Sequence, residues 1–402
     1  MVKKMLIRRD LSSTLIYFAK KLPVIALLGP RQSGKTTLVR AIFENHKYIS
    51  LEDRDQRLFA NEDPRGFLRE FSNNNRYGLI LDEIQHVPSL LSYIQTIVDQ
   101  EEKPGYFVIT GSQNILVNQA IAQSLAGRVA ILTLLPFSLK ELKGNNLLPN
   151  SATQALYYGG YPRIYAKDLL PPEWYPFYIQ TYIERDVRQI TNVSDLSTFQ
   201  RFMGLCAGRI GQILNYSSLA NDCGISVNTA KAWLSILEAS YIVFLLHPHY
   251  KNFSKRLIKS PKLFFYDTGI ACSLLGIKSA QELSLHYLRG GLFESMVISE
   301  LYKQYYNLGQ RAQLYFWRDS QGHEVDCIID QGLIVAPLEI KASETINSNY
   351  FETLDYWNNL AQTDSKYSFV IYAGQENQRR TKATVVSWSS IEIILSSLSV
   401  NP

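Results

Sequence analysis

Eight consecutive residues carry the most specific chemical signal in this chain. They fit the pattern G-x-x-x-x-G-K-[ST] and are, in order, Gly29, Pro30, Arg31, Gln32, Ser33, Gly34, Lys35 and Thr36. The glycines let such a loop curl so that its N–H groups face phosphate oxygens, while Lys35 reaches the β- and γ-phosphates and Thr36 ligates Mg²⁺. The loop, with Thr37 at the start of the helix that follows, therefore predicts binding of ATP with Mg²⁺.

Two adjacent carboxylates, Asp82 and Glu83, supply the second signal. They end the apolar run Leu79–Leu81, and ligands of parallel sheets bind at the carboxyl ends of strands. A carboxylate at the first position suits the Mg²⁺ that accompanies a triphosphate, and one at the second suits an attacking water. Asp82 is therefore the expected Mg²⁺ residue and Glu83 the expected general base.

A third polar group ends the next apolar run. Ser112, Gln113 or Asn114 is expected to contact the γ-phosphate or to position the water, with Gln113 the candidate for nucleotide binding. Thr-Gly-Ser is also a common sequence in turns that bind no ligand. The side chain that contacts the phosphate therefore stays open among the three.

Arginines are candidates for a further role, because a guanidinium neutralises charge on a transferring phosphoryl group, from the same chain or a neighbour. Arg128 and Arg163 are the candidates here. Each of them could equally be an ordinary surface or hinge arginine. Arg128 is the preferred candidate for the arginine that contacts the phosphoryl group.

The elements that must position these residues follow from the apolar pattern. Short apolar runs alternate with longer mixed segments, at Val24–Leu28, Tyr48–Leu51, Leu79–Leu81, Tyr106–Ile109 and Ile131–Leu135. Strands separated by helical segments are typical of a parallel sheet with covering helices. The sequence therefore predicts an α/β fold for this part of the chain.

Residues 200–261 have a different, helical spacing of apolar side chains. Tyr216–Leu234 has the form of a helix-turn-helix, with a Ser-capped first helix, a glycine in the turn and a second helix beginning near Ser226. Apolar runs at Tyr241–Leu246 and Leu263–Tyr266 would supply the strands of a wing. A winged helix is the expected unit.

A basic stretch lies within this region. It contains no acidic residue and consists of Lys251, Lys255, Arg256, Lys259 and Lys262. Such a stretch suits the DNA backbone and reads no bases. A lid of an ATPase or a protein-docking module with solvated lysines is an equal alternative.

Four polar residues near the C-terminus indicate a second chemistry. Glu294 lies in a helical segment, Asp326 on one expected strand, and Glu339 and Lys341 on the next, where their spacing of two places them on one face. This order is similar to the core of metal-dependent nucleases. There Glu294, Asp326 and Glu339 would hold Mg²⁺ or Mn²⁺, and Lys341 would orient or deprotonate water. Glu324 projects from the same side as Asp326, and such folds also serve as inert binding platforms.

Composition sets the outer bounds. A chain of 402 residues with 46% hydrophobic residues predicts two or three packed domains. The net charge of +5 permits a polyanionic partner without requiring one. Four scattered cysteines favour neither a zinc site nor a disulfide framework and indicate the cytoplasm, and no run of 18 apolar residues predicts a membrane span.

Several motifs together resemble an AAA-type P-loop ATPase family whose members carry a C-terminal domain of unknown function 4143. They are the phosphate loop, Leu-Asp-Glu-Ile-Gln at 81–85, Thr-Gly-Ser at 110–112 and Leu-Ala-Gly-Arg at 125–128. The similarity continues through Gly-Gly-Tyr-Pro at 159–162, Tyr-Ile-Glu-Arg-Asp-Val at 182–187 and Tyr-Asp-Thr-Gly at 266–269. The resemblance implies an α/β P-loop NTPase sheet with covering helices, a winged-helix unit and an α/β restriction-endonuclease-like domain.

The expected domains are an ATPase domain with a helical lid at 1–199, a winged helix at 200–284 and a nuclease-like domain at 285–402. One hypothesis is an ATPase that acts on DNA through the last two domains. The other is a nucleotide-controlled switch for a protein partner, with an inert nuclease-like domain. Both allow a homo-oligomer. A small-molecule kinase is less favoured, because the Asp82-Glu83 pair suits water as the acceptor.

Overall fold

The computed structural model describes residues 7–72, 76–101, 103–112, 121, 123–182, 195–249 and 259–398. The chain forms two compact units. The first comprises residues 1–137 with 239–241 and 305–310, and the second comprises 138–238, 242–304 and 311–402. Within the described residues, no helix is long and apolar enough to cross a membrane.

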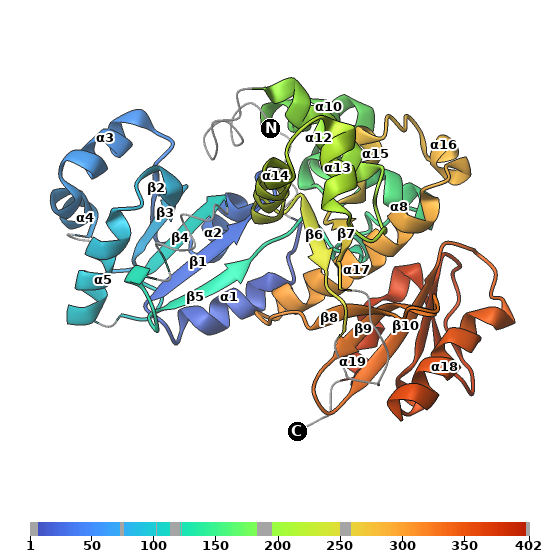
Figure 1. Cartoon of the computed structure of the whole chain (residues 1–402). Helices are drawn as coiled ribbons and strands as arrows, with labels where there is room; N and C mark the ends of the chain where they lie inside the picture. Colours follow the sequence, from blue (N-terminus) through green and yellow to red (C-terminus); the bar gives the residue numbers. More distant parts are fainter. Residues whose placement is uncertain are drawn as a thin grey trace. The chain divides into compact units, whose positions relative to one another are not determined.

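The first unit is built on a parallel five-stranded sheet with the strand order β2-β3-β4-β1-β5 (Figure 1). Its strands are β1 (Val24–Gly29), β2 (Lys47–Ser50), β3 (Leu79–Asp82), β4 (Phe107–Ser112) and β5 (Val129–Thr133). The predicted α/β class is confirmed. The last strand begins two residues earlier than its apolar run, because Val129 pairs in register with Val24.

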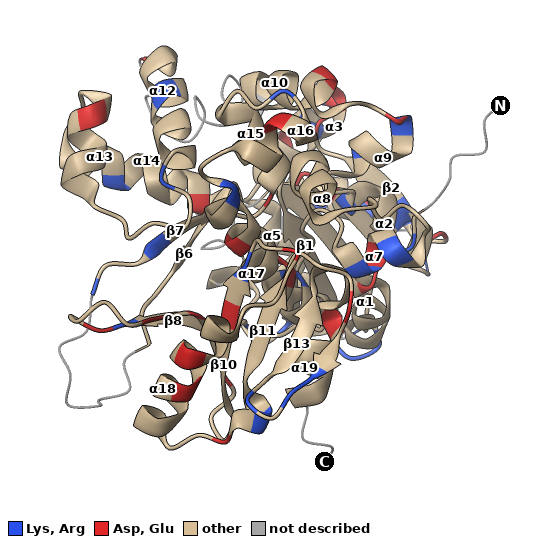
Figure 2. Ribbon diagram, turned by 90° about the vertical axis from the view of Figure 1, so that its right-hand side faces the viewer, with Lys and Arg blue, Asp and Glu red and all other residues tan. Residues whose placement is uncertain are grey.

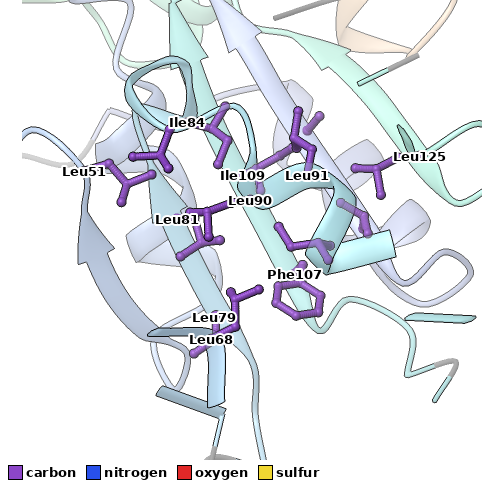
Figure 3. Packing of buried hydrophobic residues seen from close by; sticks show 14 of the residues in the cluster. Leu51, Leu68, Leu79, Leu81, Ile84, Leu90, Leu91, Phe107, Ile109 and Leu125 are labelled. Atoms are coloured by element: carbon purple, nitrogen blue, oxygen red, sulfur yellow. The ribbon is translucent and has the colours of Figure 1, made fainter. Parts of the chain in front are cut away.

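Helices cover both faces of this sheet because successive strand residues point to opposite sides. Ile25 and Leu27 face α1 (Leu11–Ala19) and α2 (Lys35–Ile42). The opposite face packs on a second cluster, which Figure 3 shows at close range. Its helices are α3 (Arg54–Glu62), α4 (Pro64–Ser72) and α5 (Leu90–Gln100), with the short η1 (Ile84–His86). Each fully buried leucine or isoleucine of these clusters contributes about 1.5–3 kcal/mol.

The second unit begins with helices. They are α7 (Leu139–Gly144), α8 (Ala152–Tyr158), α9 (Pro162–Lys167), α10 (Pro171–Tyr182), α12 (Leu196–Ala207), α13 (Tyr216–Cys223) and α14 (Val227–Ala239). An antiparallel pair follows, β6 (Val243–Leu246) and β7 (Lys262–Phe265), and then α15 (Thr268–Leu274), α16 (Ala280–Leu285) and α17 (Arg289–Asn307).

The predicted helix-turn-helix corresponds to α13 and α14. Gly224 ends α13 in the left-handed region at φ 73°, which a glycine adopts without strain. The predicted serine cap of the first helix is wrong, because the Asn215 side chain accepts the Ser218 N–H at 3.0 Å. Helices α12–α14 with the β6–β7 pair are the elements that a winged helix needs. That fold stays a prediction.

The Tyr-Asp-Thr-Gly motif has a structural explanation. Asp267 caps α15 by accepting the Ile270 N–H at 3.1 Å, and it also accepts the Gly160 N–H at 2.7 Å and the Tyr175 hydroxyl at 2.9 Å. Burial raises the pKa of Asp267. The approach is close, since a Cβ at Gly269 would lie 2.3 Å from the Tyr175 hydroxyl. This motif therefore ties the α8–α9 connection, α10 and α15 together.

A mixed six-stranded sheet completes the second unit, with the order β12-β13-β11-β10-β9-β8. The strands are β8 (Leu314–Arg318), β9 (Glu324–Asp330), β10 (Val335–Lys341), β11 (Phe369–Tyr372), β12 (Gln378–Arg379) and β13 (Thr384–Ser387). Its helices are η3 (Ser348–Phe351), α18 (Glu352–Ala361), η4 (Ser365–Tyr367), η5 (Trp388–Ser390) and α19 (Glu392–Leu398). Strand β10 runs antiparallel to β9 and parallel to β11.

The three predicted domain boundaries stay predictions. The residues expected for the winged helix and for the nuclease-like domain lie almost entirely in the second unit, which also contains residues 138–199 of the expected first domain.

Candidate functional site

The predicted phosphate loop joins the carboxyl end of β1 to the first residue of α2. Gly29 has φ 149°, and a Cβ there would lie 2.2 Å from the Leu134 carbonyl oxygen. Gly34 has φ 97° and stands at the N-cap of α2 without a capping side chain. The first N–H groups of α2 therefore face the loop, where they bind an anion.

Lys35 is buried at the base of this loop, with 4% of its surface exposed. Its Nζ donates to the carbonyl oxygens of Gly29 at 3.0 Å and Pro30 at 2.8 Å. These contacts hold the ammonium inside the curl of the loop. The positive φ of 59° at Gln32 adds to that curl.

Thr36 and Asp82 converge from different elements. The Thr36 hydroxyl lies 3.0 Å from both carboxylate oxygens of Asp82, which also accepts hydrogen bonds from Tyr48 at 2.8 Å and from Thr110. Burial, and then the Asp82 carboxylate, raise the pKa of Tyr48 to about 12. A threonine hydroxyl beside a buried carboxylate is the donor set that holds Mg²⁺ with a nucleotide, so these residues fit that ion.

Glu83 follows in the left-handed region at φ 61°, which few non-glycine residues adopt. Gln85 Nε2 donates to the Glu83 carboxylate and to Ser112 Oγ at 3.0 Å. Burial raises the pKa of Glu83, but Lys35, Gln85 and Arg31 together outweigh it, so the pKa is lowered. The carboxylate is ionised at neutral pH and able to accept a proton.

Three contributors were missed in the sequence. Arg9 is buried and donates to the carbonyl oxygens of Ser33 at 2.8 Å and Leu135 at 2.6 Å. Arg9 thereby clamps the phosphate loop from a position 20 residues upstream of it, where no motif signals a role. Tyr48 and Gln85 are the others: Tyr48 begins an expected strand and Gln85 ends the Leu-Asp-Glu-Ile-Gln motif, but neither was assigned a role.

The remaining predicted residues of this site fall into two groups. Arg31 lies 3.9 Å from Glu52, and Ser33 and Thr37 take their expected places in the loop and on α2. Gln113 and Asn114 lie outside the described residues.

The structure does not bring Arg128 to the phosphate loop of its own chain. Its backbone pairs with Val24 at the amino end of β1, the opposite edge of the sheet. Its guanidinium binds the Asp99 carboxylate, with Nη2 and Oδ2 3.1 Å apart. A role for Arg128, or for Arg163 on α9, in hydrolysis stays a prediction.

The predicted C-terminal residues gather in one cluster of the second unit, where two lysines neutralise them. Lys262 on β7 binds Glu294 on α17 at 2.9 Å and also binds Glu324 on β9. It is 3% exposed, so its assignment to an exposed basic stretch was wrong. Figure 2 shows the basic colour at β7. Lys259 is exposed, while Lys251, Lys255 and Arg256 lie outside the described residues.

Lys341 neutralises the other half of the cluster. Its Nζ lies 3.2 Å from Asp326 and 2.6 Å from Glu339, and Asp326 also accepts the Ile340 N–H at 2.8 Å. Burial is the largest cause of the raised pKa values of Glu294 and Glu339. Among the described residues, no three His, Cys, Asp or Glu side chains form a group that could hold a metal ion. A second metal site at Glu294, Asp326 and Glu339 stays a prediction, and Lys262 would have to leave Glu294 for a metal to bind there.

Known proteins match this chain over most of its length. The AAA domain family matches residues 21–143, and two domains of unknown function, DUF8612 and DUF4143, match residues 150–281 and 289–391. The uncharacterized protein Rv2008c of Mycobacterium tuberculosis is 30% identical over 344 residues, covering 84% of this chain and 74% of that protein. The chain belongs to the AAA-type P-loop ATPases with a C-terminal DUF4143 domain.

Other relatives of this ATPase are more distant. The uncharacterized protein MJ1544 of Methanocaldococcus jannaschii is 25% identical over 357 residues, covering 81% of this chain and 76% of that protein. Among solved structures, the Walker-type ATPase paby2304 of Pyrococcus abyssi is 16% identical, with a TM-score of 0.42, covering 68% of this chain and 97% of that one.

Proposed function

We propose that this ATPase binds Mg²⁺-ATP at the phosphate loop and hydrolyses it, and that hydrolysis is coupled to DNA bound by the second unit. The observation that carries the first part is the convergence of Thr36, Asp82 and Glu83 next to the buried Lys35. This set supplies phosphate binding, metal binding and an ionised base at one edge of one sheet. A loop that only binds nucleotide has no need of Glu83.

The residues divide the work as follows. The N–H groups of the loop and the Lys35 ammonium bind and orient the phosphates, and Thr36 and Asp82 would hold Mg²⁺. Mg²⁺, when bound, neutralises phosphate charge. Glu83 accepts a proton from the attacking water at its carboxylate, which Gln85 keeps in place through the hydrogen bond to Ser112.

DNA as the partner is supported by charge and by local structure. The net charge is +5, and α14 of the expected helix-turn-helix carries the exposed Lys231, whose Nζ lies 5.5 Å from the centre of the Tyr216 ring. Few cations lie on that helix, so contacts to phosphates without base reading are the expected mode.

A second candidate function is favoured by the lysines of the C-terminal cluster. Lys262 pairs with Glu294, a carboxylate that a nuclease would use for metal, whereas Lys341 lies beside Asp326 and Glu339 as the nuclease core also requires. This supports a nuclease-like domain that binds without cutting, in a switch that responds to ATP and docks a protein partner or a second copy of the chain.

One experiment separates these functions. ATP hydrolysis is measured for the wild type and for Lys35→Ala, with and without duplex DNA, and the DNA is then inspected for cuts under Mg²⁺ and Mn²⁺. The proposal expects that DNA stimulates ATP hydrolysis and that Lys35→Ala abolishes it. It also expects that the DNA remains uncut. Hydrolysis indifferent to DNA would remove the coupling and favour the switch. Cuts that disappear in Glu339→Ala would contradict the non-cutting domain.

A further inference from the structure

The first unit contains a cavity at the edge of the sheet opposite the phosphate loop. It has a volume of about 560 Å³ and lies between α4, α5 and the start of β4. Phe107, the first residue of β4, lines it, whereas the phosphate loop follows the last residue of β1. The volume falls within the range of about 300–1,000 Å³ that is usual for small-molecule sites.

The floor of this cavity is apolar and its walls are aromatic. Leu68, Val98 and Phe107 are almost completely buried and form the floor, and Figure 3 shows Leu68 and Phe107 near the same end of the core cluster. Tyr93 and Tyr106 are half-buried and line the cavity as well. Flat faces of this kind suit a planar ring, such as a nucleobase.

The rim of the cavity is cationic. Arg65 and Arg69 are four residues apart on α4, so they share one face of the helix. Both are exposed, and neither side chain has a hydrogen bond or an ion pair to any residue in the described part of the chain. The other cation at the rim, Lys103, is paired with Glu101 at 2.6 Å. Two guanidinium groups that pair with none of the described residues, beside an aromatic pocket, suit a phosphate, which each can bind in a bidentate way.

We infer that this cavity binds a nucleoside monophosphate group, with the base between Tyr93 and Tyr106 and the phosphate on Arg65 and Arg69. The site is separate from the phosphate loop and has no residue in common with it. The acidic residue in its lining, Glu101, is paired with Lys103 at 2.6 Å, so the proposed phosphate contacts are the two arginines. The same chemistry is offered by a free mononucleotide and by the phosphorylated end of a DNA strand.

The test uses the full-length chain carrying Lys35→Ala, so that binding at the phosphate loop is weakened. Titration calorimetry compares AMP, a short DNA strand with a 5′-phosphate, the same strand without that phosphate, and an acidic peptide. Arg65→Ala/Arg69→Ala is the pocket variant, and Arg54→Ala/Arg57→Ala on the neighbouring α3 is the control with the same change in charge. Tyr93→Leu tests the aromatic wall.

The pocket variant is expected to bind AMP or the phosphorylated strand about 10- to 100-fold more weakly, because two charge-assisted hydrogen-bonding groups are lost. Tyr93→Leu should also weaken binding, and the α3 control should not. Preference for AMP identifies a free mononucleotide as the ligand, and preference for the phosphorylated strand identifies a DNA end. Binding of the acidic peptide alone, binding of no probe, or equal losses in the pocket variant and the control would overturn the inference. ATP hydrolysis is measured separately for the pocket variant with Lys35 unchanged. A failure of the proposed ATPase function can therefore be told apart from a failure of the cavity to bind a nucleotide.

Discussion

The hydroxyl of Thr36, in the first turn of α2, lies 3.0 Å from both carboxylate oxygens of Asp82, the last residue of β3. The two residues are 46 positions apart, and the parallel order of β3, β4 and β1 brings their strand ends to one edge. Tyr48 and Thr110 add two more hydroxyl donors to the same carboxylate. In the part of the chain that the structure describes, hydroxyls and no basic side chain bond to this buried carboxylate, which suits it to a cation.

Asp82→Asn should therefore raise the Mg²⁺ concentration needed for half-maximal ATP hydrolysis, by about 10- to 100-fold. The amide keeps the shape of the side chain but removes the charge that attracts the ion. Titration of activity with Mg²⁺ measures the change. Asp99→Asn, which alters the carboxylate paired with Arg128, is the control and should leave the Mg²⁺ requirement unchanged.

Arg9→Ala should destabilise the first unit by about 1–3 kcal/mol, because the buried carbonyl oxygens of Ser33 and Leu135 lose their donor. It should also weaken ATP binding, since the loop loses its clamp. Chemical unfolding and nucleotide titration measure the two effects. Arg8→Ala, at the exposed neighbouring position, is the control. A loss of stability with unchanged ATP affinity would show that the clamp supports the fold but not the loop.

Lys262→Met should cost about 3–5 kcal/mol of unfolding free energy, because the buried Glu294 would lose its ammonium partner, while Glu324 keeps Arg318 at 3.1 Å. Lys259→Met, which removes an exposed lysine three residues earlier, should change stability little. Adding Glu294→Gln to Lys262→Met should recover part of the loss. If the two lysine variants unfold at the same denaturant concentration, the buried ion pair described above does not contribute to stability.

Glu238 gives the second unit a pH dependence near neutrality. Burial raises the pKa of Glu238 from 4.5 to about 7. The folded state favours the protonated carboxyl, so Glu238 does not lower the free energy of unfolding below the unfolded pKa. The loss of stability grows between about pH 4.5 and pH 7 and stays constant above that range. Glu238→Gln should therefore stabilise the unit by about 1–3 kcal/mol at pH 8 and far less at pH 5. Chemical unfolding at both pH values checks this, and an equal gain at both would contradict it.

The sequence was sufficient for the parts of the site that depend on local order. Gly29–Thr36 and Asp82-Glu83 each follow or end an apolar run that predicts a strand. The parallel pairing of these strands with β4 then brings the two segments to the same edge of the sheet. Arg9 could not be found this way, because its partners Ser33 and Leu135 are 24 and 126 residues away. Lys262 was misjudged for a related reason, since a run of lysines shows charge but not burial. Only the contact with Glu294 on α17 reveals that this lysine lies inside the unit.

The central claim is that Glu83 is the base of an ATP hydrolysis site, and Glu83→Gln tests it most directly. Glutamine keeps the side chain's size and its contact with Gln85 but cannot accept the proton from water. The account predicts that ATP binding, measured by equilibrium titration, is retained, while the single-turnover hydrolysis rate falls by about 10²- to 10⁴-fold. Hydrolysis at the wild-type rate by Glu83→Gln with ATP bound would contradict it.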